Sequence, residues 1–189
     1  MSAGLGLFLS VITTAVLRPS AALPAAIAFT VISCLVVGVE LRQQRSSRSV
    51  ILLAILVVLT AQAIGAATVD EPVHLLDAVL GGAAAFLAVF AVHVASPNSL
   101  TNDDVAYAAL VGTTLGWFGI GRVGLGLGLG LIIGAVSAGP QMLVTRRRAE
   151  AGLVQSRTVV AFAPALAAGA WIALCWGDVL VRWYARTPS

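Results

Sequence analysis

The sequence predicts an all-α protein, a polytopic transmembrane bundle of six or seven helical spans, and three observations carry this prediction. Apolar residues make up 59% of the chain and charged residues 10%, whereas soluble domains have about 45–50% and about 25%. The mean hydropathy is +1.00. Apolar runs near the length that crosses a bilayer, about 20 residues, follow one another along the chain. This pattern argues against a water-soluble enzyme, a nucleic-acid-binding protein and a disordered scaffold.

Short polar connections separate seven candidate spans. In order, the spans cover residues 3–17, 21–41, 49–67, 76–95, 104–120, 123–144 and 158–181. The first run is the shortest, so a bundle of six spans without it is the alternative. No connection is long enough for a separate soluble domain, and we therefore expect a single transmembrane domain over residues 1–189.

The connections also predict the orientation, because arginine concentrates in cytoplasmic loops. All eleven basic residues of the chain are arginines. Residues 42–48, after the second span, contain three of them, and residues 146–157, after the sixth span, contain four. We expect these two connections to be cytoplasmic. The connections at Asp70–Glu71 and Gly119–Arg122 are then external, with the N-terminus inside and the C-terminus outside.

This topology places two acidic positions on one side of the membrane. Glu40 ends the second span, and two spans later the chain returns to the cytoplasmic side, where Asp103 and Asp104 open the fifth span. Taken singly, each acid has a simpler interpretation. Glu40 fits an interfacial acid paired with a nearby arginine, and Asp104 fits a helix N-cap stabilised by the helix dipole. Acids at helix ends in a membrane are nevertheless candidate functional residues, since burying their charge is costly.

Two facing carboxyl groups have a well-defined chemistry. Acids about 3 Å apart cannot both ionise, so they share one proton, and one acts as base while the other acts as acid. The base activates a water molecule against a peptide carbonyl, and the acid protonates the carbonyl oxygen. Such a dyad requires neither a metal ion nor a nucleophilic serine. We predict Glu40 and Asp104 as the catalytic pair, with Asp103 as an auxiliary acid.

Other polar motifs predict no cofactor and no metal site. Cys34 and Cys175 lie in apolar runs without the CxxC spacing of zinc sites or disulfide frameworks. Residues 119–124 match GxGxxG, but they follow a membrane span rather than a strand, so we reject a dinucleotide site. His93 lies alone within a span and fits a hydrogen-bonded packing residue better than a metal ligand.

Glycines in the sixth span predict a helix contact. Gly126, Gly130 and Gly134 recur every four residues and form a small-residue face suited to close packing of another helix.

The sequence gives little support for a small transporter. We find no inverted repeat and no pair of broken helices of the kind that transporters use.

Three stretches resemble the prepilin peptidases (type IV leader peptidases), a family of membrane aspartic peptidases. Asp104-Val-Ala-Tyr-Ala-Ala-Leu-Val-Gly112, followed by Leu115-Gly-Trp117, is similar to the family's G-x-G-D-V-K-L-A-A-L-L-G stretch with its later G-W. Residues 161–169, Ala-Phe-Ala-Pro-Ala-Leu-Ala-Ala-Gly, resemble its P-F-G-P-F-L-A-L-G. Residues 75–81, Leu-Leu-Asp-Ala-Val-Leu-Gly, are similar to the segment before its fourth span. The resemblance covers roughly residues 25–185 in order and spacing.

The chain departs from the family at both acidic motifs. The family's first catalytic Asp opens a D-x-R…I-P-N pattern, where this chain has Glu40-Leu-Arg42 and no I-P-N. In the second motif, residues 101–103 read Thr-Asn-Asp in place of G-x-G, and Ala106 replaces Lys. Glutamate carries one more methylene than aspartate, and a displacement of about 1 Å can cost on the order of 100-fold in rate.

The resemblance implies two alternative functions. In the first, the chain is an aspartic endopeptidase of a prokaryotic plasma membrane that cleaves the leaders of prepilin or pilin-like proteins at the cytoplasmic face. In the second, it is a catalytically inactive homologue that acts as a binding or scaffold component of a pilus or secretion apparatus. The CxxC-containing domain of the longer family members accompanies N-methylation, and we expect no methyltransferase role here.

Overall fold

Helices form all the regular structure in the described part of the chain. The computed structural model describes Ser10, Val11, Thr13 and residues 23–43, 48–69, 72–95, 100–150 and 162–186. The helices are α2 (Leu23–Gln43), α3 (Arg48–Val69), α4 (Val73–Ala95), α5 (Asn102–Gly116), α6 (Ile120–Glu150) and α7 (Ala163–Arg186). None of these ranges contains a strand. The predicted all-α class is confirmed.

The six helices correspond to the second to seventh predicted spans. The predicted span 3–17 lies outside the described residues, apart from three of them that are helical. Among the described residues, four stretches are long and apolar enough to cross a bilayer, namely Ser49–Thr68, Val73–Ala95, Ile120–Gly139 and Ala163–Leu180. The apolar part of α2 is shorter, Leu23–Gly38. Helices are the expected spanning form, because lipid offers no hydrogen bonds to an open backbone.

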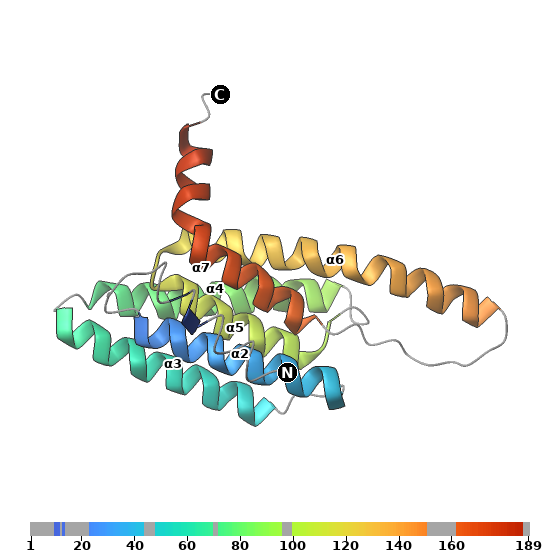
Figure 1. The fold of residues 1–189 in the computed structure, drawn as a ribbon, viewed down its shortest axis with the longest axis horizontal. Coiled ribbons are helices and arrows are strands. Elements are labelled where there is room, and N and C mark those ends of the chain that lie inside the picture. Colours follow the sequence, from blue (N-terminus) through green and yellow to red (C-terminus); the bar gives the residue numbers. More distant parts are fainter. Residues whose placement is uncertain are drawn as a thin grey trace.

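Helix α5 lies at the centre of the bundle, with α2, α3, α4, α6 and α7 packed around it (Figure 1). Its 15 residues rise about 22 Å at ~1.5 Å per residue, less than the ~30 Å of a hydrocarbon core. The predicted span 104–120 is too long at its C-terminal end, because α5 ends at Gly116. The helix stops at Gly116 because a tight turn follows, in which Gly119 adopts φ +105°, a conformation that side chains rarely allow.

Helices α4 and α5 approach each other backbone to backbone. A Cβ atom built on Gly81 of α4 would lie 2.7 Å from the carbonyl oxygen of Gly112 and 2.8 Å from the Cα of Gly116, both in α5. A Cβ on Gly112 would in turn overlap Ala85 and the Gly81 carbonyl. Side chains cannot fit between the two helices, so only glycine at these positions allows the contact.

Helices α6 and α7 make a second contact of the same kind, as the glycine repeat of the sixth span predicts. A Cβ on Gly130 would lie 3.0 Å from the Cα of Leu166, and one on Gly169 would lie 2.7 Å from the Cα of Gly130. Gly126 faces Ala170 and Ala173 of α7. The prediction of a close-packed helix face is confirmed, and its partner is α7.

Several buried polar side chains of the core donate hydrogen bonds to backbone carbonyl groups. The hydroxyls of Thr30, Thr113 and Thr114 each donate to the carbonyl four residues earlier in their own helices, at 2.8–2.9 Å. The buried Gln62 of α3 donates through Nε2 to the Thr113 carbonyl of α5 at 3.0 Å. This hydrogen bond links α3 to the central helix in a region otherwise held by apolar packing.

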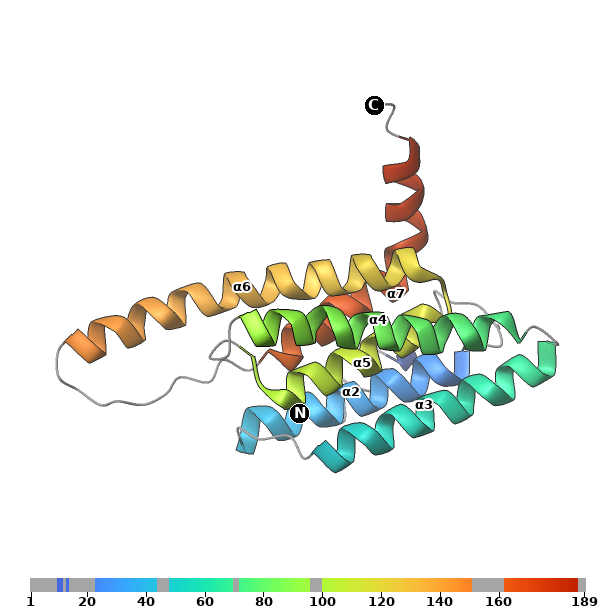
Figure 2. The same cartoon turned by 180° about the vertical axis from the view of Figure 1, so that it is seen from behind.

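The helices alternate in direction, which gives the bundle two distinct ends. The last turns of α2 and α4 and the first turns of α3, α5 and α7 lie together at what we call the Asp104 end (Figures 1 and 2). The turn between α5 and α6 lies at the opposite end, the Arg122 end. Helix α6 extends past the bundle at the Asp104 end, and the final part of α7 turns away from it at the other (Figures 1 and 2).

The α4–α5 contact predicts a sharp difference between glycines. Gly112→Ala should destabilise the protein by about 1–3 kcal/mol, the usual cost of overpacking a filled core. Gly124→Ala is the matched control, because a Cβ on Gly124 of α6 meets nothing within 4 Å. Thermal unfolding in detergent, followed by circular dichroism, measures both. Equal unfolding temperatures for the two variants would contradict the backbone contact.

Candidate active site

The candidate site begins at the residue that precedes α5. Thr101 is the N-cap of this helix, with extended backbone angles (φ −95°, ψ 162°). Its hydroxyl accepts a hydrogen bond from the Asp104 N–H at 3.2 Å. The Asp104 carboxylate reaches back, and its Oδ2 accepts from both the N–H and the hydroxyl of Thr101, each at 2.7 Å. The two residues thus form a reciprocal capping box that starts the helix.

Asp104 is the N3 residue of this box rather than the N-cap that its position suggests. Its side chain is buried, with 3% of the residue exposed, and it lies outside the four membrane-length helices. Burial raises the pKa of the Asp104 carboxyl above its ordinary value, while hydrogen bonds from Thr101 act in the opposite direction because they stabilise the carboxylate.

Two further groups influence the same carboxyl. The negative charge of the neighbouring Asp103 adds to the rise in the pKa of Asp104, and the backbone N–H of Ala163 counteracts it. Ala163 is the first residue of α7. The carboxyl of Asp104 therefore lies beside the starts of two helices, α5 and α7, where the positive ends of the helix dipoles favour an anion.

The turn that carries Thr101 is fixed to α4. Nδ1 of His93, in the last turn of α4, is 2.9 Å from the carbonyl oxygen of Leu100. Leu100 is itself 6% exposed and belongs to the main apolar core. His93 therefore serves as a hydrogen-bonded packing residue, as the sequence suggests, and it anchors the peptide that precedes the capping box.

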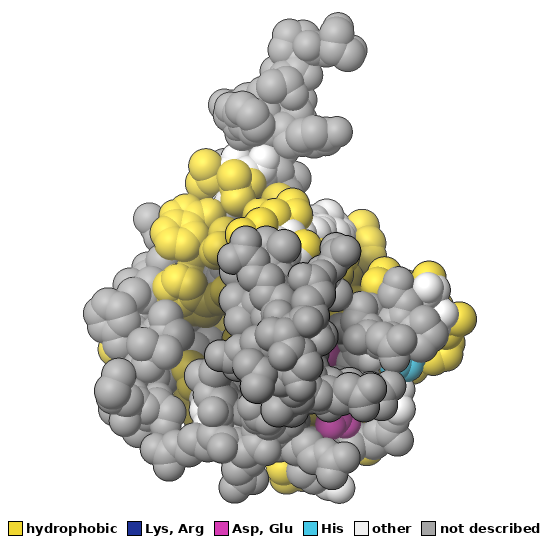
Figure 3. All heavy atoms as spheres, turned by 90° about the vertical axis from the view of Figure 1, so that its right-hand side faces the viewer, with side chains coloured by type: hydrophobic (Ala, Val, Ile, Leu, Met, Phe, Trp, Pro, Cys, Tyr) yellow, Lys and Arg dark blue, Asp and Glu magenta, His cyan; other side chains and the backbone are white. Residues whose placement is uncertain are grey.

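The predicted acids share one end of the bundle. Figure 3 views the molecule from the side of the Asp104 end and shows acidic side chains with a histidine beside them. The described acids at this end are Asp103, which is half-buried, and Asp104. Glu40 lies in the last turn of α2, which reaches the same end. The side chain of Glu40 falls outside the described residues, so the distance between the two carboxyl groups stays a prediction.

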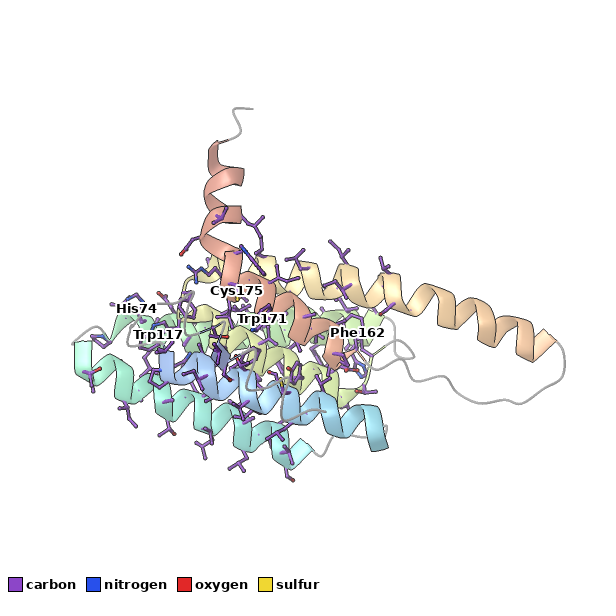
Figure 4. All side chains as sticks on the ribbon, in the orientation of Figure 1. His74, Trp117, Phe162, Trp171 and Cys175 are labelled. Carbon is purple, nitrogen blue, oxygen red and sulfur yellow. The ribbon has the colours of Figure 1, made fainter. Side chains whose placement is uncertain are left out.

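A second polar cluster lies at the Arg122 end. Arg122 forms an ion pair with Asp178 of α7, and its guanidinium lies 4.7 Å from the ring centre of Phe118. His74 stacks on Trp117 at the same end, with ring centres 5.4 Å apart (Figure 4). Asp178 is thus engaged with Arg122, away from the Asp104 site.

No metal site emerges in the part of the chain that the structure describes. No three His, Cys, Asp or Glu side chains there are grouped so that they could hold a metal ion. Both cysteines are free thiols, and Cys175 lies within α7 near Trp171 (Figure 4). The polar groups around Asp104 are hydrogen-bond donors and a second acid, which suit proton transfer.

Sequence reasoning missed Thr101 and the role of the α7 start. Thr101-Asn-Asp-Asp104 is a hydroxyl residue followed three residues later by an acid and then by an apolar run, which is the pattern of a capping box. That pattern predicts the hydrogen bonds of Thr101 from the sequence alone. No local pattern places Ala163 beside Asp104, because 59 positions of chain separate them and only the helix packing brings them together.

The chain is similar over part of its length to proteins of known function. The chain is 32% identical over 120 residues to a prepilin leader peptidase/N-methyltransferase of Aeromonas salmonicida (strain A449), which covers 61% of this chain and 38% of that protein. It is 32% identical over 117 residues to one of Aeromonas hydrophila, covering 59% of this chain and 37% of the relative. No family model and no solved structure matches the chain. The resemblance to prepilin peptidases is confirmed as a similarity to curated prepilin leader peptidase/N-methyltransferases over about 60% of this chain.

Proposed function

We propose that the chain is a membrane aspartic peptidase that cleaves the leader peptides of prepilin-like proteins at the cytoplasmic face, through a dyad of Glu40 and Asp104. The observation that carries the proposal is the buried Asp104 carboxyl at the bundle end that the Glu40 turn of α2 also reaches. The matched relatives, which are prepilin leader peptidase/N-methyltransferases, support this substrate class. The chain spans about 38% of the length of the first of them.

The helical spacing of α2 supports Glu40 as the second acid. Phe29, Ser33 and Val36 are all buried and recur at three- and four-residue intervals along α2. Position 40 is the next position on this stripe, because residues four apart lie on one face of a helix. Val36 and Val105 of α5 both belong to the main apolar core, and the last turn of α2 lies at the bundle end where α5 begins (Figure 1).

The proposed reaction needs only the two acids and water. One carboxylate takes a proton from water, and the oxygen attacks the carbonyl carbon of the scissile peptide bond. The other acid donates its proton to the carbonyl oxygen, which gives a gem-diol. The first carboxyl group then passes the proton that it took from water to the leaving amine, and the second carboxylate takes a proton back from a hydroxyl of the gem-diol. The bond between carbon and nitrogen breaks, and the products are a carboxylic acid and a free amino terminus. Burial raises the pKa of Asp104 overall, and the donors from Thr101 oppose this rise because they stabilise the carboxylate, the form in which we assign it as base.

A catalytically inactive homologue that binds or scaffolds components of a pilus or secretion apparatus is the second candidate. One observation favours it: the capping box already gives the Asp104 carboxyl a structural role, as a hydrogen-bond acceptor from Thr101. The two candidates make opposite predictions for purified protein in lipid vesicles supplied with a prepilin.

The proposal predicts the effect of removing either acid. Asp104→Asn should abolish leader cleavage, because a dyad with one ionisable member cannot share a proton, and Glu40→Gln should do the same. Asp77→Asn, in α4 near the Arg122 end, is the matched control and should cleave as the wild type does. Cleavage of a prepilin in vesicles, followed by gel mobility, measures all three. Persistent cleavage by Asp104→Asn would remove that residue from the mechanism, and Asp103 would be tested next.

The length of the side chain at position 40 provides a separate test. Glu40→Asp should keep or raise the rate of leader cleavage, because it shortens the side chain by one methylene and restores the aspartate of the resembling motif. Initial rates in the same vesicles, compared with Glu40→Gln, measure the effect. The scaffold candidate expects no cleavage by any of these proteins, the wild type included.

A further inference from the structure

The hydrogen bonds that Thr101 donates to Asp104 both go to one of its two carboxyl oxygens. The N–H and the hydroxyl of Thr101 both donate to Oδ2, each at 2.7 Å. Two donors on one oxygen fix the position of the Asp104 carboxyl group and also its rotation about the Cβ–Cγ bond. They leave Oδ1 as the oxygen that Thr101 does not use.

We propose that Thr101 is a positioning residue for catalysis, which holds Oδ2 of Asp104 so that Oδ1 is presented to water and to the second acid. This inference rests on the proposed peptidase function. Thr101 does not touch the reacting atoms and acts only through Asp104.

The support behind Thr101 makes it suited to this role. Its N–H belongs to the peptide whose carbonyl, that of Leu100, is bound by His93 of α4. Its own carbonyl accepts from the Val105 N–H at 3.3 Å, within the first turn of α5. The two donors of Thr101 are thus attached to both α4 and α5. Such support matters because a displacement of a catalytic group by about 1 Å can lower the rate on the order of 100-fold.

The hydroxyl of Thr101 also affects the protonation of Asp104. A donor to a carboxylate favours the ionised form, so loss of the hydroxyl should raise the pKa of Asp104. Other titratable or charged groups lie on the elements around this end and remain unchanged in the variants: Asp103 on α5, His93 on α4, Glu40 and Arg42 on α2, and Arg48 on α3.

The kinetic test compares Thr101→Val, Thr101→Gly and Thr101→Ser. Valine keeps the shape of threonine without the hydroxyl, and glycine is a competent N-cap that lacks any side chain. Both should lower kcat for leader cleavage roughly 10- to 100-fold, as expected for losing a hydrogen bond to a charged group, with KM little changed. The acidic limb of the pH–rate profile should move to higher pH. Thr101→Ser retains the hydroxyl and should recover most of kcat and the wild-type profile.

Thr114→Val is the matched control for these variants. Thr114 is another buried threonine of α5, and its hydroxyl donates to the carbonyl of Leu110 in its own helix at 2.9 Å. Its loss should leave the pH profile unchanged. If Thr101→Val and Thr101→Gly lower only the unfolding temperature and keep the wild-type kcat and pH profile, Thr101 is a helix cap alone and the inference is wrong.

A second readout does not depend on cleavage. Dicyclohexylcarbodiimide reacts with protonated carboxyl groups in apolar surroundings, and mass spectrometry of peptides assigns the label to Asp104. The pH midpoint of labelling should be higher in Thr101→Val and Thr101→Gly than in the wild type. If the midpoint is higher in the variants but the wild type cleaves no leader, the peptidase function is refuted and the effect of Thr101 on Asp104 is retained. If the midpoint is the same in the variants as in the wild type, and the wild type cleaves the leader, the role of Thr101 is refuted and the peptidase function is retained.

Discussion

The burial of α5 on all sides is the constraint on which the rest of the structure depends. Lipid does not drive helices together as water does, so their association relies on close packing and on hydrogen bonds between them. Helix α4 meets the central helix where Gly81 faces Gly112 and Gly116, and α3 adds the hydrogen bond from Gln62. These contacts hold α5 at a fixed height and rotation. Because Asp104 lies in its first turn, they also fix where the carboxyl is placed.

The Asp104 carboxyl shows how a buried acid remains usable. Removing an ionised carboxylate from water is costly unless donors replace the lost solvent. Here Thr101 supplies two donors, and the first peptide of α7 adds to them. The structural duty of capping the helix falls on one oxygen, Oδ2. A single side chain thus caps the start of a helix and, in the proposed mechanism, uses its other oxygen for proton transfer.

The positions of the helices follow from the sequence because apolar runs of membrane length have few alternatives. The end of α5 does not, since Trp117 and Phe118 are as apolar as the helix before them, and only the conformation of Gly119 reveals the turn. The contact between α6 and α7 was visible as the repeat of Gly126, Gly130 and Gly134. By contrast, Gly81 and Gly112 lie alone in separate helices, and their pairing exists only once the helices are packed.

The sequence accounts for the end of the bundle at which the candidate site lies, while the pairing of its two acids stays a prediction. The sequence places Glu40 and Asp104 on one side through the count of spans, and the helix directions agree. The hydrogen bonds that control Asp104 have two sources. Those of Thr101 are local, and a sequence pattern contains them. The approach of Ala163 is tertiary, because it depends on how far α7 reaches along the central helix, and no spacing encodes that distance.

The glycine contacts also bear on how far proteins of this architecture can diverge. Lipid adapts to any apolar surface, so an exposed residue of α3 such as Leu52 or Leu56 is exchangeable for many others at little cost. At Gly112 every other side chain is too large. Substitutions therefore accumulate on the outside of the bundle and are eliminated along its axis. Two descendants of one ancestor would lose most of their recognisable identity while a few small residues, scattered through the alignment, preserved the same architecture.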